Sequence, residues 1–102
     1  MNIHYSNLQS DTLLNVSMSE GFTCHDSKAF KPFVTLSFDN QDIKVIVFDM
    51  QKLSRIDSGA LGMLLLCIEE AKRKNISIEF INASGQVSKM LNLSNQLSTY
   101  MH

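Results

Sequence analysis

The sequence has few of the residues and segments that mark several protein classes. It contains no tryptophan, one proline and four glycines in 102 residues, and it shows no internal repeat or low-complexity segment. Its two cysteines, Cys24 and Cys67, lie far apart and outside any CxxC or Cys/His metal-ligand spacing. No run reaches the about 18 apolar residues of a membrane span, and no signal peptide opens the chain. We therefore expect a cytoplasmic protein with no metal, no cofactor and no membrane insertion.

The charge balance is unlike that of a nucleic-acid-binding protein. Nine Lys and Arg residues against ten Asp and Glu residues give a formal net charge of -1, without a basic patch. The one cationic cluster, Lys72-Arg73-Lys74, falls at the end of a predicted helix, where cations interact favourably with the helix dipole. An apolar content of 44% with 19% charged residues is typical of one globular domain, here residues 1–102.

The N-terminal part predicts a β-hairpin followed by a helix. Residues 2–8 and 12–18 have strand character, and Ser10-Asp11 supplies the turn between them. Residues 19–21 break the second strand. A helical period follows from Asp26, and Pro32 requires that this helix either starts near residue 31 or is kinked. A polar connection over residues 38–42 then follows.

The rest of the chain predicts a parallel pair of strands joined by a long helix. Residues 44–49 form a near-continuous apolar strand, and a loop to Ile56 leads into a helix over residues 58–74. Residues 77–82 form the next strand, which completes a right-handed βαβ unit. Another helix starts at Ser84 or Gly85, and the tail from Leu93 forms a short helix or a last strand.

The order of these elements indicates an α/β fold. It predicts a small mixed β-sheet of four to five strands, with helices packed mainly on one face.

Ser58 lies at the start of the long helix and has two interpretations. Asp57 and Ser58 can each cap this helix, so a purely structural role is the simpler one. Gly59 and Ala60, however, leave backbone N–H groups open and the hydroxyl accessible. A phosphate on Ser58 could be held by the helix N-terminus, or it could repel a partner that binds the bare serine.

The long helix is more apolar than one buried face requires. One stripe, expected to face the sheet, consists of Leu61, Leu64, Leu65, Ile68 and Ala71. A second stripe of Met63, Leu66 and Cys67 is either covered by another helix, such as the last one, or exposed. In the second case Met63 and Leu66 form a patch for a binding partner.

The motif around Ser58 resembles the STAS domain of bacterial anti-sigma factor antagonists. The resemblance rests on residues 45–49, Leu53 and Asp57-Ser58-x-x-Leu61-Gly62 with the apolar run that follows. Residues 78–84, 87–91 and 93–94 extend it, so that it covers residues 44–95 well and the first 40 in layout only. The most similar members are single-domain antagonists with the motif Asp-Ser-Ser-Ala-Leu-Gly-Met-Leu-Leu, from partner-switching systems for biofilm and motility control.

The resemblance implies a phosphorylation switch in which Ser58 is the phosphoacceptor. The unphosphorylated domain would bind a cognate regulator or anti-sigma factor, often a GHKL-type serine kinase, which phosphorylates it with ATP. A PP2C-type phosphatase would restore the bare serine. The domain would then be a substrate and not an enzyme. Its expected partner-binding residues are Thr23, Asp57, Ser58, Gly59, Ala60, Gly62, Met63 and Leu66.

Two positions depart from the family pattern. Gly59-Ala60 replaces the second Ser/Thr and the glycine of the commoner motif, which affects loop shape and kinase recognition. Thr23 stands where the family often has an aspartate near the acceptor, which affects the set of partners.

Three alternatives are less well supported by the residues. In a receiver domain Asp49 would be the acceptor, but the first strand offers Asn2, His4 and Ser6 in place of an acidic pair for Mg²⁺. A serine hydrolase would need a G-x-S-x-G motif, which Ser58 lacks. A STAS subunit of a transport assembly would keep the fold without needing a phosphoacceptor.

Overall fold

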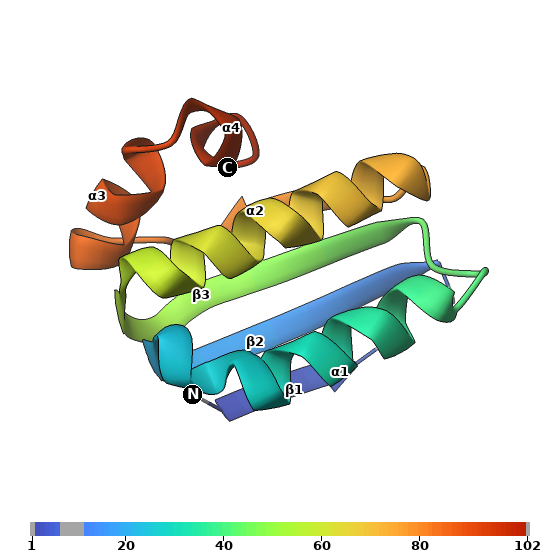
Figure 1. The fold of residues 1–102 in the computed structure, drawn as a ribbon, viewed down its shortest axis with the longest axis horizontal. Helices are drawn as coiled ribbons and strands as arrows, with labels where there is room; N and C mark the ends of the chain where they lie inside the picture. The colour runs from blue at the N-terminus through green and yellow to red at the C-terminus, as the bar shows by residue number, and fades with distance from the viewer. Residues whose placement is uncertain (1, 7–11, 102) are drawn as a thin grey trace.

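Four strands form one mixed sheet in the order β1-β2-β3-β4. The computed structural model describes residues 2–6 and 12–101 (Figure 1). The β1 strand pairs antiparallel with β2, and β2, β3 and β4 run parallel, so the predicted mixed sheet and the βαβ unit are confirmed. The strands are β1 (Asn2–Ser6), β2 (Leu13–Phe22), β3 (Val45–Ile56) and β4 (Ser77–Ile81).

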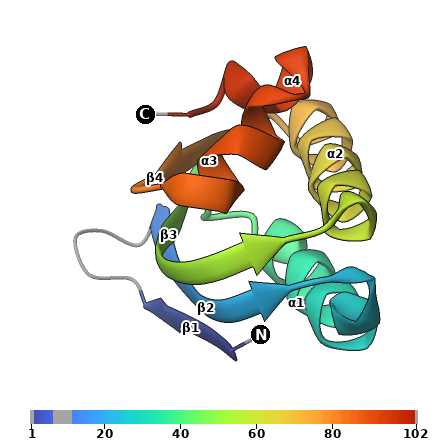
Figure 2. The same ribbon diagram turned by 90° about the vertical axis from the view of Figure 1, so that its left-hand side faces the viewer.

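The two long helices cover one face of this sheet. Figure 2 shows α1 and α2 side by side on the same face, with α3 and α4 at the β4 end of the molecule. This arrangement confirms the prediction of an α/β fold with helices mainly on one face. The helical segments are the 3-10 turn η1 (Cys24–Asp26), α1 (Ser27–Asp39), α2 (Ser58–Arg73), α3 (Gly85–Asn92) and α4 (Asn95–Ser98).

A row of phenylalanine rings joins the sheet to α1. Phe30 of α1 lies 4.9 Å from Phe22 and 6.4 Å from Phe48, ring centre to ring centre, and Phe48 lies 5.7 Å from Phe80 of β4. All four side chains are buried. Burying each such side chain contributes about 1.5–3 kcal/mol, so this row holds α1 and three strands together.

The two central strands are longer than the sequence predicts. Residues 19–21 do not end β2, and the predicted loop 50–56 continues β3 as far as Ile56. The extra lengths pair with each other, with register shifts between Ser17 and Ser19 and between Glu20 and Gly21. Such bulges remove the two-residue period on which strand prediction depends, because they place an extra residue on one strand.

The helix predictions need smaller corrections. The α1 helix starts at Ser27 and continues through Pro32 to Asp39, so it is neither delayed to Lys31 nor ended before residue 38. Pro32 is exposed, and its ring needs no space in the core. The tail forms α4 and also one parallel bridge from Met101 to Phe80.

Leu8 and the predicted turn Ser10-Asp11 lie outside the described residues. Among the described helices, none has the length and apolar character needed to cross a membrane.

Candidate functional site

Ser58 is the first residue of α2, at the point where the chain leaves β3. Ser58 is exposed, and so is Gly59, which has no side chain to cover it. Within residues 2–6 and 12–101 the Ser58 hydroxyl makes no hydrogen bond. The hydroxyl is therefore accessible to another protein and is not used to hold the fold together.

Asp57, and not Ser58, caps the helix. One carboxylate oxygen, Oδ1, accepts the Ala60 N–H at 2.8 Å, and the other, Oδ2, accepts the Cys24 N–H at 3.1 Å. The Asp57 N–H donates to the Phe22 carbonyl at 3.2 Å. Asp57 thus joins α2 to η1 and to the end of β2, and this resolves which of the two adjacent residues is the cap.

The two backbone donors keep Asp57 ionised. The hydrogen bond from the Ala60 N–H, and then the one from the Cys24 N–H, lower the pKa of this carboxyl below its ordinary value. Because the folded-state pKa is lowered, ionised Asp57 stabilises the folded chain above the ordinary carboxyl pKa. That contribution is lost as the pH falls through the lowered value. At neutral pH a fixed negative charge therefore lies next to Ser58.

Thr23 caps η1. The Thr23 hydroxyl accepts the His25 N–H at 3.3 Å, and the Thr23 N–H donates to Asp26 Oδ2 at 2.8 Å. Thr23 thus shapes the turn that carries Cys24, and its role in partner binding stays a prediction. Sequence reasoning missed Cys24, whose exposed side chain lies against the start of α2.

The two glycines of α2 have different surroundings. A Cβ built on Gly59 would lie 2.5 Å from the Cys24 Cβ and 3.2 Å from the Cys24 Cα, so Gly59 allows η1 to approach α2. A Cβ built on Gly62 would meet nothing within 4 Å. Ala60 is fully buried, which corrects its prediction as a partner-binding residue.

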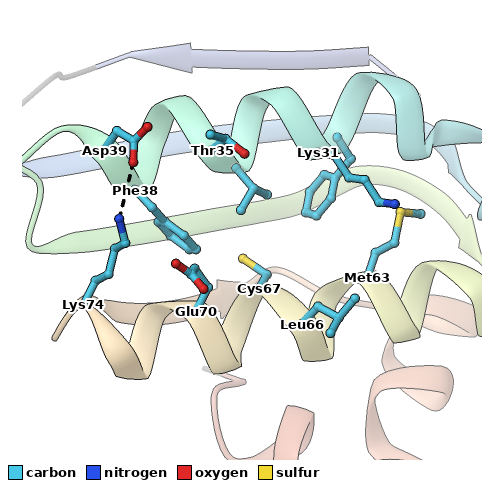
Figure 3. A pocket seen from close by; sticks show the side chains of 11 residues that line it. Lys31, Thr35, Phe38, Asp39, Met63, Leu66, Cys67, Glu70 and Lys74 are labelled. Atoms are coloured by element: carbon cyan, nitrogen blue, oxygen red, sulfur yellow. Dashed lines mark hydrogen bonds and ion pairs between the residues drawn. The ribbon is translucent and has the colours of Figure 1, made fainter.

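The second apolar stripe of α2 faces α1. Figure 3 shows Met63 and Cys67 directed from α2 toward α1, across a groove of about 390 Å³ whose lining includes Phe38. Met63 is 9% exposed and Cys67 is 3% exposed, whereas Leu66 is 66% exposed. Of the two alternatives for this stripe, burial under another helix holds for Met63 and Cys67, and exposure holds for Leu66. The covering helix is α1 and not the last helix. Burial raises the pKa of the Cys67 thiol to about 12.

Asp49 lies within β3 and not at its end. Its Oδ1 accepts the Gln51 N–H at 3.0 Å and the Asn82 side-chain amide at 3.1 Å. The β1 strand, with its three polar residues, is separated from β3 by β2. Among the described residues no group of three or more His, Cys, Asp or Glu side chains could hold a metal ion. These surroundings give no support to a receiver-type site.

A family model for the STAS domain matches residues 5–99 of the chain. The chain belongs to the STAS-domain family. This match spans the βαβ unit and the C-terminal helices, and it also includes residues 5–40, which resemble the family only in layout.

The STAS domain is similar to proteins of more than one role. It is 43% identical over 49 residues to a STAS-domain-containing protein of Pseudomonas aeruginosa (strain UCBPP-PA14), and the matched stretch spans 48% of each chain. The anti-sigma factor antagonist SpoIIAA in its unphosphorylated form has a TM-score of 0.84 at 15% identity, covering 99% of this chain and 86% of the other. The phosphorylated form of Bacillus SpoIIAA has a TM-score of 0.78 at 15% identity, covering 99% of this chain and 89% of the other.

A transporter contains the same fold. The murine anion transporter Slc26a9 has a TM-score of 0.71 at 16% identity, covering 87% of this chain and 16% of the transporter. At these identities the solved structures show a shared fold, and a shared role does not follow from them.

The surroundings of the two α2 glycines predict opposite effects of alanine on stability. Gly59→Ala should lower the free energy of unfolding by about 1–3 kcal/mol, because Cys24 must move. Gly62→Ala should raise it by about 0.5–1 kcal/mol, because alanine favours a helix and the site is open. Urea denaturation of both variants measures this difference. A Gly59→Ala protein as stable as Gly62→Ala would contradict the observed packing of Cys24 on Gly59.

Proposed function

We propose that this STAS domain is a protein-binding switch of the anti-sigma factor antagonist type, controlled by phosphorylation of Ser58. The observation that carries the proposal is the exposed Ser58 hydroxyl, which makes no hydrogen bond to any described residue and lies beside Asp57, the residue that caps the helix. Structural similarity to SpoIIAA, which has been solved in both unphosphorylated and phosphorylated forms, supports the same role.

Phosphorylation at this position changes charge without removing a structural contact. A kinase would transfer the γ-phosphoryl group of ATP to the Ser58 Oγ, which loses its proton as ADP leaves. The new group carries a charge of about -1.5 to -2 and stands beside ionised Asp57. Backbone N–H groups in the first turn of α2 can hold it. The fold is kept, and a partner that docks on the neutral serine meets two adjacent negative groups.

The docking surface extends from Ser58 along the outer side of α2. Ser58, Gly62 and Leu66 are four residues apart in succession, so they lie along one side of the helix. Gly62 allows close approach of another backbone, and exposed Leu66 offers an apolar anchor. We define these three residues as the α2 docking face. Asp57 and Gly59 lie at its Ser58 end, with Cys24 of η1 alongside.

This chemistry requires two partners, a kinase and a phosphatase. A GHKL-type serine kinase, which can itself be the anti-sigma factor, would bind the α2 docking face and phosphorylate Ser58. A PP2C-type phosphatase would remove the phosphate. Since the kinase brings ATP and the catalytic groups, the STAS domain contributes the acceptor and the docking surface and is not itself an enzyme.

Incubation with ATP and the cognate kinase should place one phosphate on Ser58. Mass spectrometry after proteolysis identifies the modified residue, and Ser58→Ala should remove the signal. Ser54→Ala is the matched control, because Ser54 is also exposed and lies four residues earlier. Phosphate on another residue, or none with any candidate kinase, would rule out the switch.

Leu66→Glu should weaken kinase binding about tenfold or more, because it places a charge on the apolar anchor of the docking face. Calorimetry or surface plasmon resonance with the kinase measures the change in Kd. Leu36→Glu is the matched control, since Leu36 is 72% exposed but lies on α1. Equal losses of affinity in the two variants would place the interface elsewhere.

A role as a subunit of a transport assembly is the second candidate. The shared fold of the STAS domain and part of murine Slc26a9 favours it. Such a role does not depend on a phosphoacceptor, so partner capture would then be the same for the wild-type protein, Ser58→Ala and Ser58→Asp. In the switch, Ser58→Asp releases the partner and Ser58→Ala keeps it.

A further inference from the structure

Within the part of the chain that the structure describes, the second half of β3 has a neighbouring strand on one side only. The β2 strand pairs with β3 as far as Ile56, whereas β4 pairs with it only over Val45–Asp49. Residues 50–56 of β3, which lead to Ser58, therefore form no strand pairing on the side of β4. Helix α3 packs against β3 there (Figure 2). Backbone groups in such a stretch need other partners, because an unpaired buried N–H or carbonyl is costly.

Gln86, in the first turn of α3, pairs with both backbone groups of the last β3 residue. Its Oε1 accepts the Ile56 N–H at 2.9 Å, and its Nε2 donates to the Ile56 carbonyl at 2.8 Å. The Ile56 side chain is 2% exposed, so this residue is held by packing as well. A side-chain amide carries one acceptor and two donors, which lets Gln86 replace a strand residue at this one position.

The turn after β4 directs Gln86 back toward β3. Asn82 and Gly85 have positive φ values of 61° and 56°. Left-handed backbone of this kind is accessible to glycine and tolerated by asparagine. The turn brings α3 across the end of β3, and Gln86 follows Gly85 directly.

The anchored residue is separated from Ser58 by Asp57 alone. Asp57 is itself held by the Phe22 carbonyl, and its carboxylate holds the N–H groups of Cys24 and Ala60. The two residues before Ser58 are therefore both held by hydrogen bonds. The Ile56 backbone is bonded to Gln86 of α3, and the Asp57 N–H is bonded to Phe22 of β2. Loss of the Gln86 contact would free the Ile56 backbone on the α3 side and leave two polar groups unpaired.

We infer that Gln86 is a positioning residue for the Ser58 phosphoacceptor, a role that rests on the proposed function. Gln86 does not contact the phosphoryl group. It acts through Ile56 and Asp57, whose fixed backbone presents the Ser58 hydroxyl in one orientation to the kinase.

Native-state hydrogen exchange of Gln86→Met tests the anchoring step without any kinase. The amides of Ile56 and Asp57 should exchange about tenfold faster relative to that of Phe48, which lies between two paired strands. Gln96→Met makes the same chemical change at an exposed residue of α4 and should alter neither ratio. Equal acceleration at all three amides, or none, would overturn the inference.

Gln86→Glu provides a second variant if Gln86→Met does not fold. Its carboxylate can accept the Ile56 N–H but cannot donate to the Ile56 carbonyl, so acceleration at Asp57 should again exceed that at Phe48. The absence of any such difference in a folded Gln86→Glu protein would also overturn the inference.

Phosphorylation kinetics then connect the anchor to Ser58. With the cognate kinase, Gln86→Met should lower kcat several-fold and change KM little, whereas Gln96→Met should match the wild-type protein. Equal rates for wild type and Gln86→Met would overturn the role of Gln86 alone. A wild-type Ser58 that no kinase phosphorylates would overturn the proposed function and this role with it.

Discussion

The Asp57 carboxylate is the contact on which the candidate site depends. Its two oxygens bind the N–H of Ala60 in α2 and the N–H of Cys24 in η1, so one side chain closes the helix and also fixes the neighbouring turn. Because Asp57 accepts the Ala60 N–H, Ser58 is not needed as the helix cap. Asp57 and Ser58 can each cap a helix, but only Asp57 does so here, and Ser58 is left exposed.

The rest of the fold brings η1 and the start of α2 to the same end of the sheet. Parallel pairing of β2 and β3 continues to Phe22 and Ile56, so η1 and the start of α2 emerge side by side. Gly59 then allows Cys24 to pack directly on the first turn of α2. A side chain at position 59 would meet Cys24, so the absence of one lets η1 fill this space.

The strongest local patterns in the sequence predicted the βαβ unit correctly. The apolar run of β3, the long helical period of α2 and the next strand have few competing interpretations. The second half of β3 was missed because its buried residues, Met50, Leu53 and Ile56, are three apart and do not alternate. Met63 was misplaced because a helical period shows which residues share a face but not which neighbouring helix covers it.

The contacts that define the site join residues far apart in the chain. Cys24 and Asp57 are 33 residues apart, and Gln86 and Ile56 are 30 residues apart. No local period or motif contains such pairs, so they follow only from the three-dimensional arrangement. The place of Ser58 at the start of α2 was predictable, because it belongs to a short motif next to the most regular helix of the chain.

In the proposed switch, one phosphate on Ser58 determines whether a partner docks on α2. The most direct test compares the Kd of the kinase for the unphosphorylated protein and for protein fully phosphorylated on Ser58, measured by calorimetry. Like charges brought together in an interface cost several kcal/mol, so the phosphorylated form should bind about 100-fold more weakly or worse. Equal affinity of the two forms would contradict the proposed phosphorylation switch.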